Sequence, residues 1–234
     1  MTRCTASSPN CRISRSASTS TGSTANRPIG CKGESEMGNV IKGIPVIYQY
    51  PVLPTGCEAT AMTMLLNWAG VDVKNTDVAI ALPKVPLPHA VDGKLYGGNP
   101  NKGFVGDPFT QESYGVFHGP VAALLEQYLP GRAADLSGGT MNDVYRALDD
   151  GRPVIVWATI KLREGRETDV WQDEDGTEIR WISPQHCMLM IGYDDEHVFI
   201  NDPDTGQTEQ YPRDLFESRW ELLGKQAVTV TVKG

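Results

Sequence analysis

The sequence lacks any long hydrophobic run: no stretch approaches the roughly 18–20 consecutive apolar residues that cross a bilayer as a helix. We therefore expect no integral membrane segment. Basic residues are also scarce, because the 234-residue chain has a net charge of −8 and residues 34–234 hold 16 basic against 29 acidic side chains. A nucleic-acid partner requires a basic surface, so the composition argues against one.

Cysteines and histidines are too few, and too irregularly spaced, to suggest a metal site or a disulfide framework. Of the five cysteines, three lie in the first 33 residues and only Cys57 and Cys187 in the remainder. The sequence contains neither a Cys-x-x-Cys nor a His-x-x-x-His pair. We expect no metal ion or other cofactor.

Residues 1–40 form a zone of different composition, with 13 serines or threonines and no aromatic residue. Such a segment buries too little apolar surface to offset its chain entropy, so we expect it to be disordered. It has no apolar stretch of the kind found in a secretory signal. Its Arg- and Ser-rich composition fits a transit peptide, an unstructured leader, or sequence upstream of a true start at Met37. Cytoplasmic and exported locations both stay open.

Residues 41–234 have the pattern of a single α+β domain, with a helical first half followed by a sheet of mainly antiparallel strands. Residues 186–193 are almost all apolar, which is typical of a central strand covered on both faces. Residues 83–108 are rich in glycine, proline and asparagine and predict a long irregular loop. Helices are predicted at 56–68, after Thr76, and at 120–129, 140–151 and 215–222; strands at 44–48, 154–158, 186–193, 197–201, after a turn at 204–206, and at 227–232; and a charged hairpin at 162–182.

Cys57 stands at the predicted start of the first helix. Thr55 and Glu58 have the spacing of a capping box, which places Cys57 in the first helical turn. The free N–H groups and the helix dipole there favour a thiolate, which is the nucleophilic form of cysteine. Alone, the residue could equally be a small buried side chain, so the interpretation depends on its partners.

His186 opens the apolar strand at 186–193, and the next strand brings Asn201 and Asp202 to the same end of the sheet. A lone histidine here could be a satisfied core residue, but a neighbouring acceptor would orient its ring for catalysis. Adjacent strand residues point to opposite faces, so only one of the two can reach His186. We favour Asp202, with Asn201 in reserve, and expect the other to cap the turn before Pro203.

Gln49 lies eight residues before Cys57. The prolines at 51 and 54 would force the chain into a tight detour that could return the Gln49 amide to the sulfur. Its side-chain N–H groups and the backbone N–H of Cys57 could then bind an oxyanion. The alternative is an ordinary polar residue at the end of a strand. Cys187 is expected to be an inert buried residue, because strand alternation points it away from the His186 side.

Together these residues resemble the papain-like cysteine peptidases. The closest resemblance is to a stand-alone bacterial branch of cysteine peptidase family 39, which includes the bacteriocin-processing enzymes that cut after double-glycine leaders. The resemblance implies a papain-like fold, with Cys57 as nucleophile, His186 as base, Asp202 as its orienting group and Gln49 as oxyanion donor. It covers residues 44–232 and is carried by residues 53–61, 99–108, 186–189 and 201–203.

The predicted function is thiol-dependent hydrolysis of peptide or amide bonds in a peptide or protein substrate, through an acyl-enzyme on Cys57. Two alternatives stay open: an acyl or peptidyl transferase that uses the same site, and a non-catalytic binding module that keeps the fold. The loop at 97–108 could shape either a peptide cleft or an acceptor site. The chain lacks the membrane helices and phosphate-loop motif of the bacteriocin exporters, so coupled export is not implied.

Overall fold

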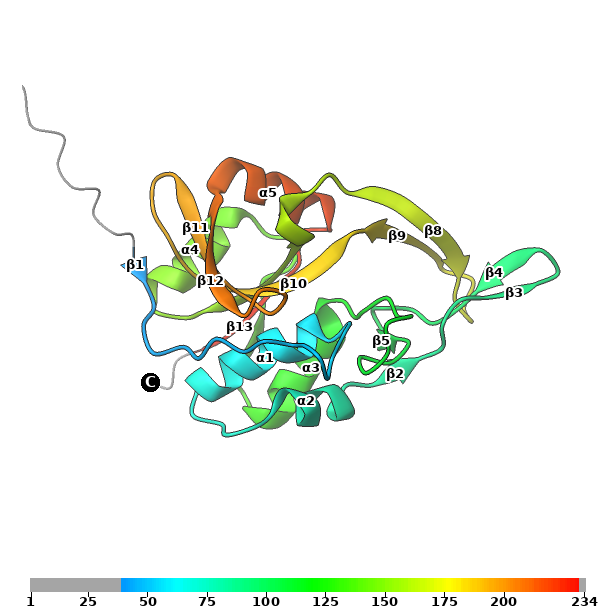
Figure 1. Ribbon diagram of the computed structural model, residues 1–234, viewed down its shortest axis with the longest axis horizontal. Helices are drawn as coiled ribbons and strands as arrows, with labels where there is room; N and C mark the ends of the chain where they lie inside the picture. Colours follow the sequence, from blue (N-terminus) through cyan, green and yellow to red (C-terminus); the bar gives the residue numbers. More distant parts are fainter. Residues whose placement is uncertain (1–38, 232–234) are drawn as a thin grey trace, which may run out of the picture. The chain divides into compact units, whose positions relative to one another are not determined.

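Strand β10 (Gln185–Tyr193) lies at the centre of a seven-stranded sheet in the computed structural model, which describes residues 39–231 (Figure 1). The strand order is β12-β11-β10-β7-β13-β6, with β1 also paired to β10, and every pairing is antiparallel. The other members are β1 (Asn39–Val40), β6 (Ala133–Asp135), β7 (Val154–Thr159), β11 (His197–Asp202), β12 (Gln207–Pro212) and β13 (Ala227–Val230).

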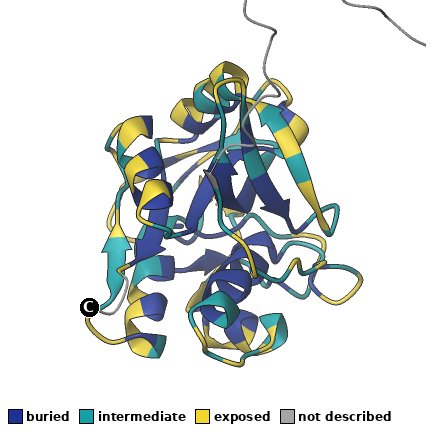
Figure 2. Ribbon diagram, turned by 90° about the vertical axis from the view of Figure 1, so that its left-hand side faces the viewer, coloured by how far each residue is buried: buried dark blue, intermediate teal, exposed yellow. Residues whose placement is uncertain are grey.

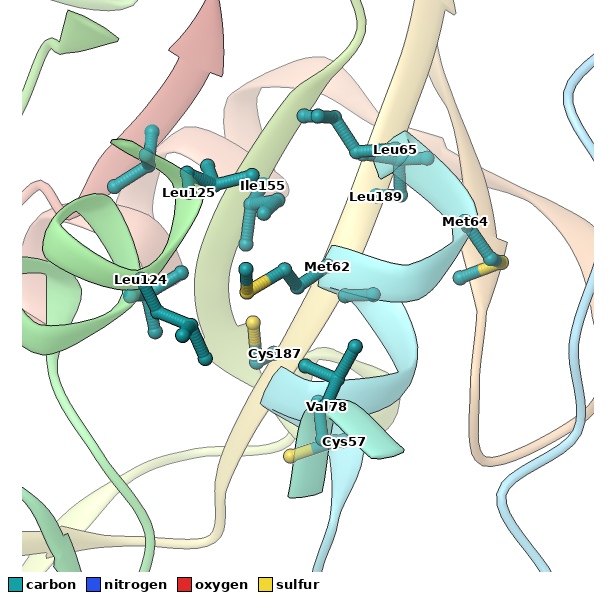
Figure 3. Close-up of a cluster of buried hydrophobic side chains, with 14 of the residues drawn as sticks. Cys57, Met62, Met64, Leu65, Val78, Leu124, Leu125, Ile155, Cys187 and Leu189 are labelled. Atoms are coloured by element: carbon teal, nitrogen blue, oxygen red, sulfur yellow. The ribbon is translucent and has the colours of Figure 1, made fainter. Parts of the chain in front are cut away.

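Helices cover both faces of this sheet, as Figure 1 shows. Along β10, Cys187 and Leu189 pack into the core under the first three helices (Figure 3), whereas Met188 and Met190 pack into the core under the last two. In Figure 2 the central strands are accordingly buried. The predicted central strand covered on both faces is confirmed. The helices are α1 (Cys57–Trp68), α2 (Asn75–Ala81) and α3 (His118–Tyr128) on one side, and α4 (Met141–Asp149) and α5 (Arg213–Leu222) on the other.

A second, four-stranded sheet extends beyond the central one, in the order β3-β4-β8-β9. It contains the predicted charged hairpin, now seen as β8 and β9, and it has a small core of its own around Trp171 and Trp181. Its strands are β3 (His89–Val91), β4 (Lys94–Tyr96), β8 (Arg166–Gln172) and β9 (Glu178–Ser183); two further strands, β2 (Lys84–Val85) and β5 (Phe104–Val105), pair in parallel, and a 3₁₀ turn, Ile160–Leu162, follows β7.

The mixed α+β arrangement predicted from the sequence is confirmed, but some elements differ. The strand predicted at 44–48 is wrong, because this segment forms no strand in the structure. Pro45 within it and Pro51 just after it lack the N–H that a sheet ladder needs. Strand β1 instead includes residues 39 and 40, which lie inside the segment predicted to be disordered. Residues 1–38 lie outside the described part of the chain. Within 39–231, no helix is both long and apolar enough to cross a membrane.

Candidate active site

Cys57 is the first residue of α1, as predicted, and Gly56 is the N-cap. A side chain at Gly56 would place its Cβ 2.7 Å from the Cβ of Leu53, so the close turn before the helix requires glycine. The predicted capping box is wrong, because no side chain caps this helix. The Thr55 hydroxyl donates instead to the carbonyl of Thr110 at 2.9 Å.

Glu58, the other member of the expected capping box, is completely buried beside the thiol. Its Oε2 accepts a hydrogen bond from the Sγ of Cys57 at 3.3 Å. Its Oε1 accepts from the N–H of Val116 at 3.1 Å and from Nε2 of Gln185 at 3.2 Å. Gly115 leaves room for this approach, since a Cβ at that position, where φ is +146°, would lie 2.5 Å from Glu58 Oε1.

The Cys57 side chain is only 9% exposed, and its surroundings favour the neutral thiol. Burial and then the negative charge of Glu58 raise the pKa of Cys57 well above its ordinary value, although the N–H groups of Cys187 and Glu58 act in the opposite direction. The thiolate expected from the helix N-terminus is therefore wrong for the free protein, because desolvation and a neighbouring carboxylate outweigh the helix dipole.

His186 and Asp202 form a buried pair: His186 Nε2 lies 2.6 Å from Asp202 Oδ1. Asp202 also accepts from the N–H of Asp204 at 2.8 Å and, through Oδ2, from the hydroxyl of Tyr211 at 3.3 Å. Burial alone would raise the pKa of Asp202, but the His186 hydrogen bond and charge hold that pKa below its ordinary value. With Nε2 engaged, Nδ1 of His186 is the ring nitrogen left for a reacting thiol.

Asn201 points to the other side of β11. Its Oδ1 accepts a hydrogen bond from the hydroxyl of Thr208 at 2.7 Å, across the strand pair that joins β11 to β12. The expectation that it would cap the turn before Pro203 is wrong, because Asp202 accepts the N–H of Asp204 as well as contacting His186. Asp202 therefore both contacts His186 and caps the turn, whereas we predicted that Asp202 and Asn201 would each make one of these contacts.

Gln49 is buried beside the same segment, but its amide is directed at the backbone. Its Nε2 donates to the carbonyls of Leu53 and Pro54, both at 3.1 Å, and its own N–H donates to the carbonyl of Pro203. The side chain therefore shapes the detour before Cys57. Donation from Gln49 to an oxyanion would require the amide to release one of the two carbonyls.

Cys57 and His186 line one cavity of about 210 Å³. Trp181 forms part of its wall. The loop at 97–108 does not contribute to this lining in the described chain. It lines a different cavity of about 310 Å³, through Gly97, Gly98, Asn99 and Lys102. Other residues that line the cavity with Cys57 and His186 are Gln49, Tyr50, Thr55, Tyr114, Gln185 and Asp204.

Four residues were not predicted from the sequence to lie around Cys57 and His186: Glu58, Gln185, Tyr50 and Asp204. The Tyr50 hydroxyl donates to Asp204 at 3.0 Å, and burial together with this carboxylate raises the pKa of Tyr50 to about 12. Glu58 and Gln185 immediately adjoin Cys57 and His186 in sequence, which is the signal that could have identified them. Between residues 39 and 231, no group of three or more His, Cys, Asp or Glu side chains is placed to hold a metal ion.

A model of the Peptidase_C39 like family matches residues 41–228. The chain belongs to this family. The chain is also similar to YvpB of Bacillus subtilis (strain 168), a protein described as uncharacterized. The two are 34% identical over 213 residues, which cover 90% of this chain and 82% of YvpB. A crystal structure from Bacillus anthracis, provisionally described as a C39-like peptidase, matches with a TM-score of 0.76 and 34% identity, covering 83% of this chain and 98% of that one.

The family expected from residues 53–61, 99–108, 186–189 and 201–203 is thereby confirmed, and so is the mixed α+β fold with its helical half before its antiparallel sheet. In this C39-like chain, the matched region contains Cys57, His186 and Asp202.

Proposed function

We propose that this C39-like protein is a cysteine peptidase that hydrolyses peptide bonds through an acyl-enzyme on Cys57. The main support is geometric: Cys57, at the start of α1, lines the same cavity as His186, whose ring is fixed by buried Asp202. A cysteine at a helix start, a histidine lining the same cavity and a carboxylate that fixes the histidine ring support acyl transfer as the reaction. Membership of a peptidase-like family supports a peptide or protein as the substrate class.

In the proposed reaction, Nδ1 of His186 takes the thiol proton, and the electron pair left on Sγ attacks the substrate carbonyl carbon. His186 then gives the proton to the leaving amine, which leaves an acyl group on sulfur. Water, deprotonated by His186, then attacks the acyl carbon, the C–S bond breaks to release the acid, and His186 returns the proton to Sγ. Asp202 orients the imidazole and stabilises its charged form.

The developing oxyanion needs donors aimed at it before reaction. The backbone N–H of Cys57, at the start of α1, is one proposed donor. Gln49 is the second, after its amide leaves the carbonyl of Leu53 or Pro54. This requirement makes Gln49 a residue whose contribution depends on bound substrate.

The test is cleavage of a diverse peptide library, followed by mass spectrometry, with the intact protein and its Cys57→Ala and His186→Ala variants. We expect both substitutions to abolish cleavage. His118→Ala is the matched control, because His118 pairs with Asp135 away from the cavity. Cleavage by Cys57→Ala at the wild-type rate would refute the proposal. Adding an amine acceptor would separate hydrolysis, which yields the free acid, from transfer.

A further inference from the structure

The carboxylate of Glu58 is the closest charged group to the proposed nucleophile, and the reaction described above gives it no task. It is completely buried between α1, the segment before α3 and the start of β10. Its two oxygens accept from three different donors, and one of those donors is the Cys57 thiol, at 3.3 Å. Burying a carboxylate costs free energy unless hydrogen bonds compensate for the lost water. The hydrogen bonds of Glu58 therefore indicate its role.

Two of the three contacts do not require a negative charge. The N–H of Val116 and the amide of Gln185 both reach Oε1, and a neutral amide oxygen would serve them equally well. The contact that depends on the carboxylate is the one from Oε2 to sulfur. An acceptor-only group at that position selects the S–H form of cysteine, because a thiolate would have no hydrogen to share and would face a like charge.

We propose that Glu58 is a positioning residue that holds the Cys57 thiol as a hydrogen-bond donor in the resting site and so keeps the nucleophile neutral. The proposal rests on the proposed function only in taking Cys57 as the nucleophile. When the thiol turns to His186, its proton passes from Sγ to Nδ1 and the bonding electron pair stays on sulfur. Glu58 itself neither gains nor loses a proton.

The groups around the thiol agree with this assignment. From β10, His186 and Cys187 face the pair formed by Cys57 and Glu58, and from the segment before α1, Tyr50 does so. Tyr50 and Cys187 are both neutral at pH 7, because burial raises the pKa of each. Burial raises the pKa of Glu58 as well, while the N–H groups of Glu58 and Val116, the Cys57 thiol and the charge of His186 act in the opposite direction. In its charged form, Glu58 is the carboxylate in direct contact with the sulfur.

The test is the pH dependence of Cys57 alkylation by iodoacetamide in the full chain and in Glu58→Gln. Alkylation must be read at the Cys57 peptide by mass spectrometry, because the chain has four other cysteines. Glutamine is isosteric: its Oε1 can still accept from Val116 and Gln185, while its new N–H groups can donate to a thiolate. We expect the midpoint of the profile to fall and the rate at pH 7 to rise about tenfold, the effect of one pKa unit.

Glu126→Gln is the matched control, since Glu126 also accepts backbone N–H groups, from Gly131 and Ala133, but does not line the cavity. Its profile should match that of the wild type. A merely structural Glu58 would lower the melting temperature of Glu58→Gln without lowering the alkylation midpoint. An unchanged or raised midpoint in Glu58→Gln would overturn the proposal.

A second measurement needs no Glu58 variant. The infrared S–H stretching band of Cys57, obtained at pH 7 as the difference between the wild type and Cys57→Ala, should be present and shifted to low frequency by its acceptor. Absence of the band would mean a resting thiolate and would also overturn the proposal. Neither measurement uses peptide cleavage, so a protein that cleaves no peptide yet shows both effects would refute the peptidase function alone.

Discussion

Replacing Asp202 by asparagine separates the charge of the buried pair from its shape. In the wild type, Oδ1 of Asp202 accepts from His186 and from the N–H of Asp204, and Oδ2 accepts from Tyr211. An asparagine can keep Oδ1 on the first two donors and turn its amide N–H towards the Tyr211 oxygen. We therefore expect Asp202→Asn to fold and to retain the orientation of the imidazole.

In the proposed reaction, the variant loses stabilisation of the imidazolium that forms when His186 takes the thiol proton. A hydrogen bond to a charged group contributes about 1.5–3 kcal/mol. At 1.36 kcal/mol for each factor of ten, this loss lowers kcat/KM by about 10- to 150-fold. Most of the loss should appear in kcat, because Asp202 is fully buried behind His186 and cannot touch substrate directly.

The assay is steady-state cleavage of a peptide found by the library screen. Asn201→Ala is the control, because Asn201 is the adjacent residue on β11 but bonds to Thr208 on the opposite side. It should keep kcat/KM within about twofold of the wild type, in line with a contact remote from the reaction. If Asp202→Asn were fully active, or if Asn201→Ala lost as much, the assignment of Asp202 as the orienting group would be refuted.

Three further results are expected. The pKa of Asp202 is lowered in the folded protein, so its pair with His186 stabilises the fold above about pH 4, and this contribution is lost on acidification. The difference in melting temperature between the wild type and Asp202→Asn should therefore become smaller as the pH is lowered. A difference that grows on acidification would contradict this. Gly115→Ala should lower the free energy of unfolding, measured in urea, by about 2 kcal/mol more than Gly131→Ala does, because Gly131 also has a positive φ but has open space around it. Equal losses of stability would argue against a steric clash at Gly115. Gln49→Ala should lower kcat by about 100-fold with little change in KM if the amide binds the oxyanion; a change in KM alone would exclude that role.

The central elements could be predicted because their signals are local. The residues of β10 that follow His186 are almost all apolar, which predicts a strand buried on both faces. Strand alternation allows only one of Asn201 and Asp202 to face His186. In the structure Asp202, the residue favoured from the sequence, contacts His186, whereas Asn201 bonds to Thr208. Family membership was predictable because the four motifs, at 53–61, 99–108, 186–189 and 201–203, occur together and in the expected order along the chain.

The surroundings of Cys57 could not be predicted, because they depend on residues distant in sequence. The capping-box spacing of Thr55 and Glu58 is a weak local preference, and it loses to the donors that Val116 and Gln185 supply from 58 and 127 residues away. The same burial overrides the helix dipole at the thiol. The strands between residues 84 and 105 were also missed, because each has only two or three residues and shows no alternation.

Trp181 belongs both to the small core of the four-stranded sheet and to the wall of the cavity that Cys57 and His186 line. Its ring stacks on Phe117 at 5.7 Å and meets the edge of Tyr114 at 5.1 Å. Any ligand that shifts this wall must therefore also disturb the aromatic packing behind it. The indole is in effect a built-in optical probe: occupancy of the cavity should alter its fluorescence, even for a ligand that is never cleaved.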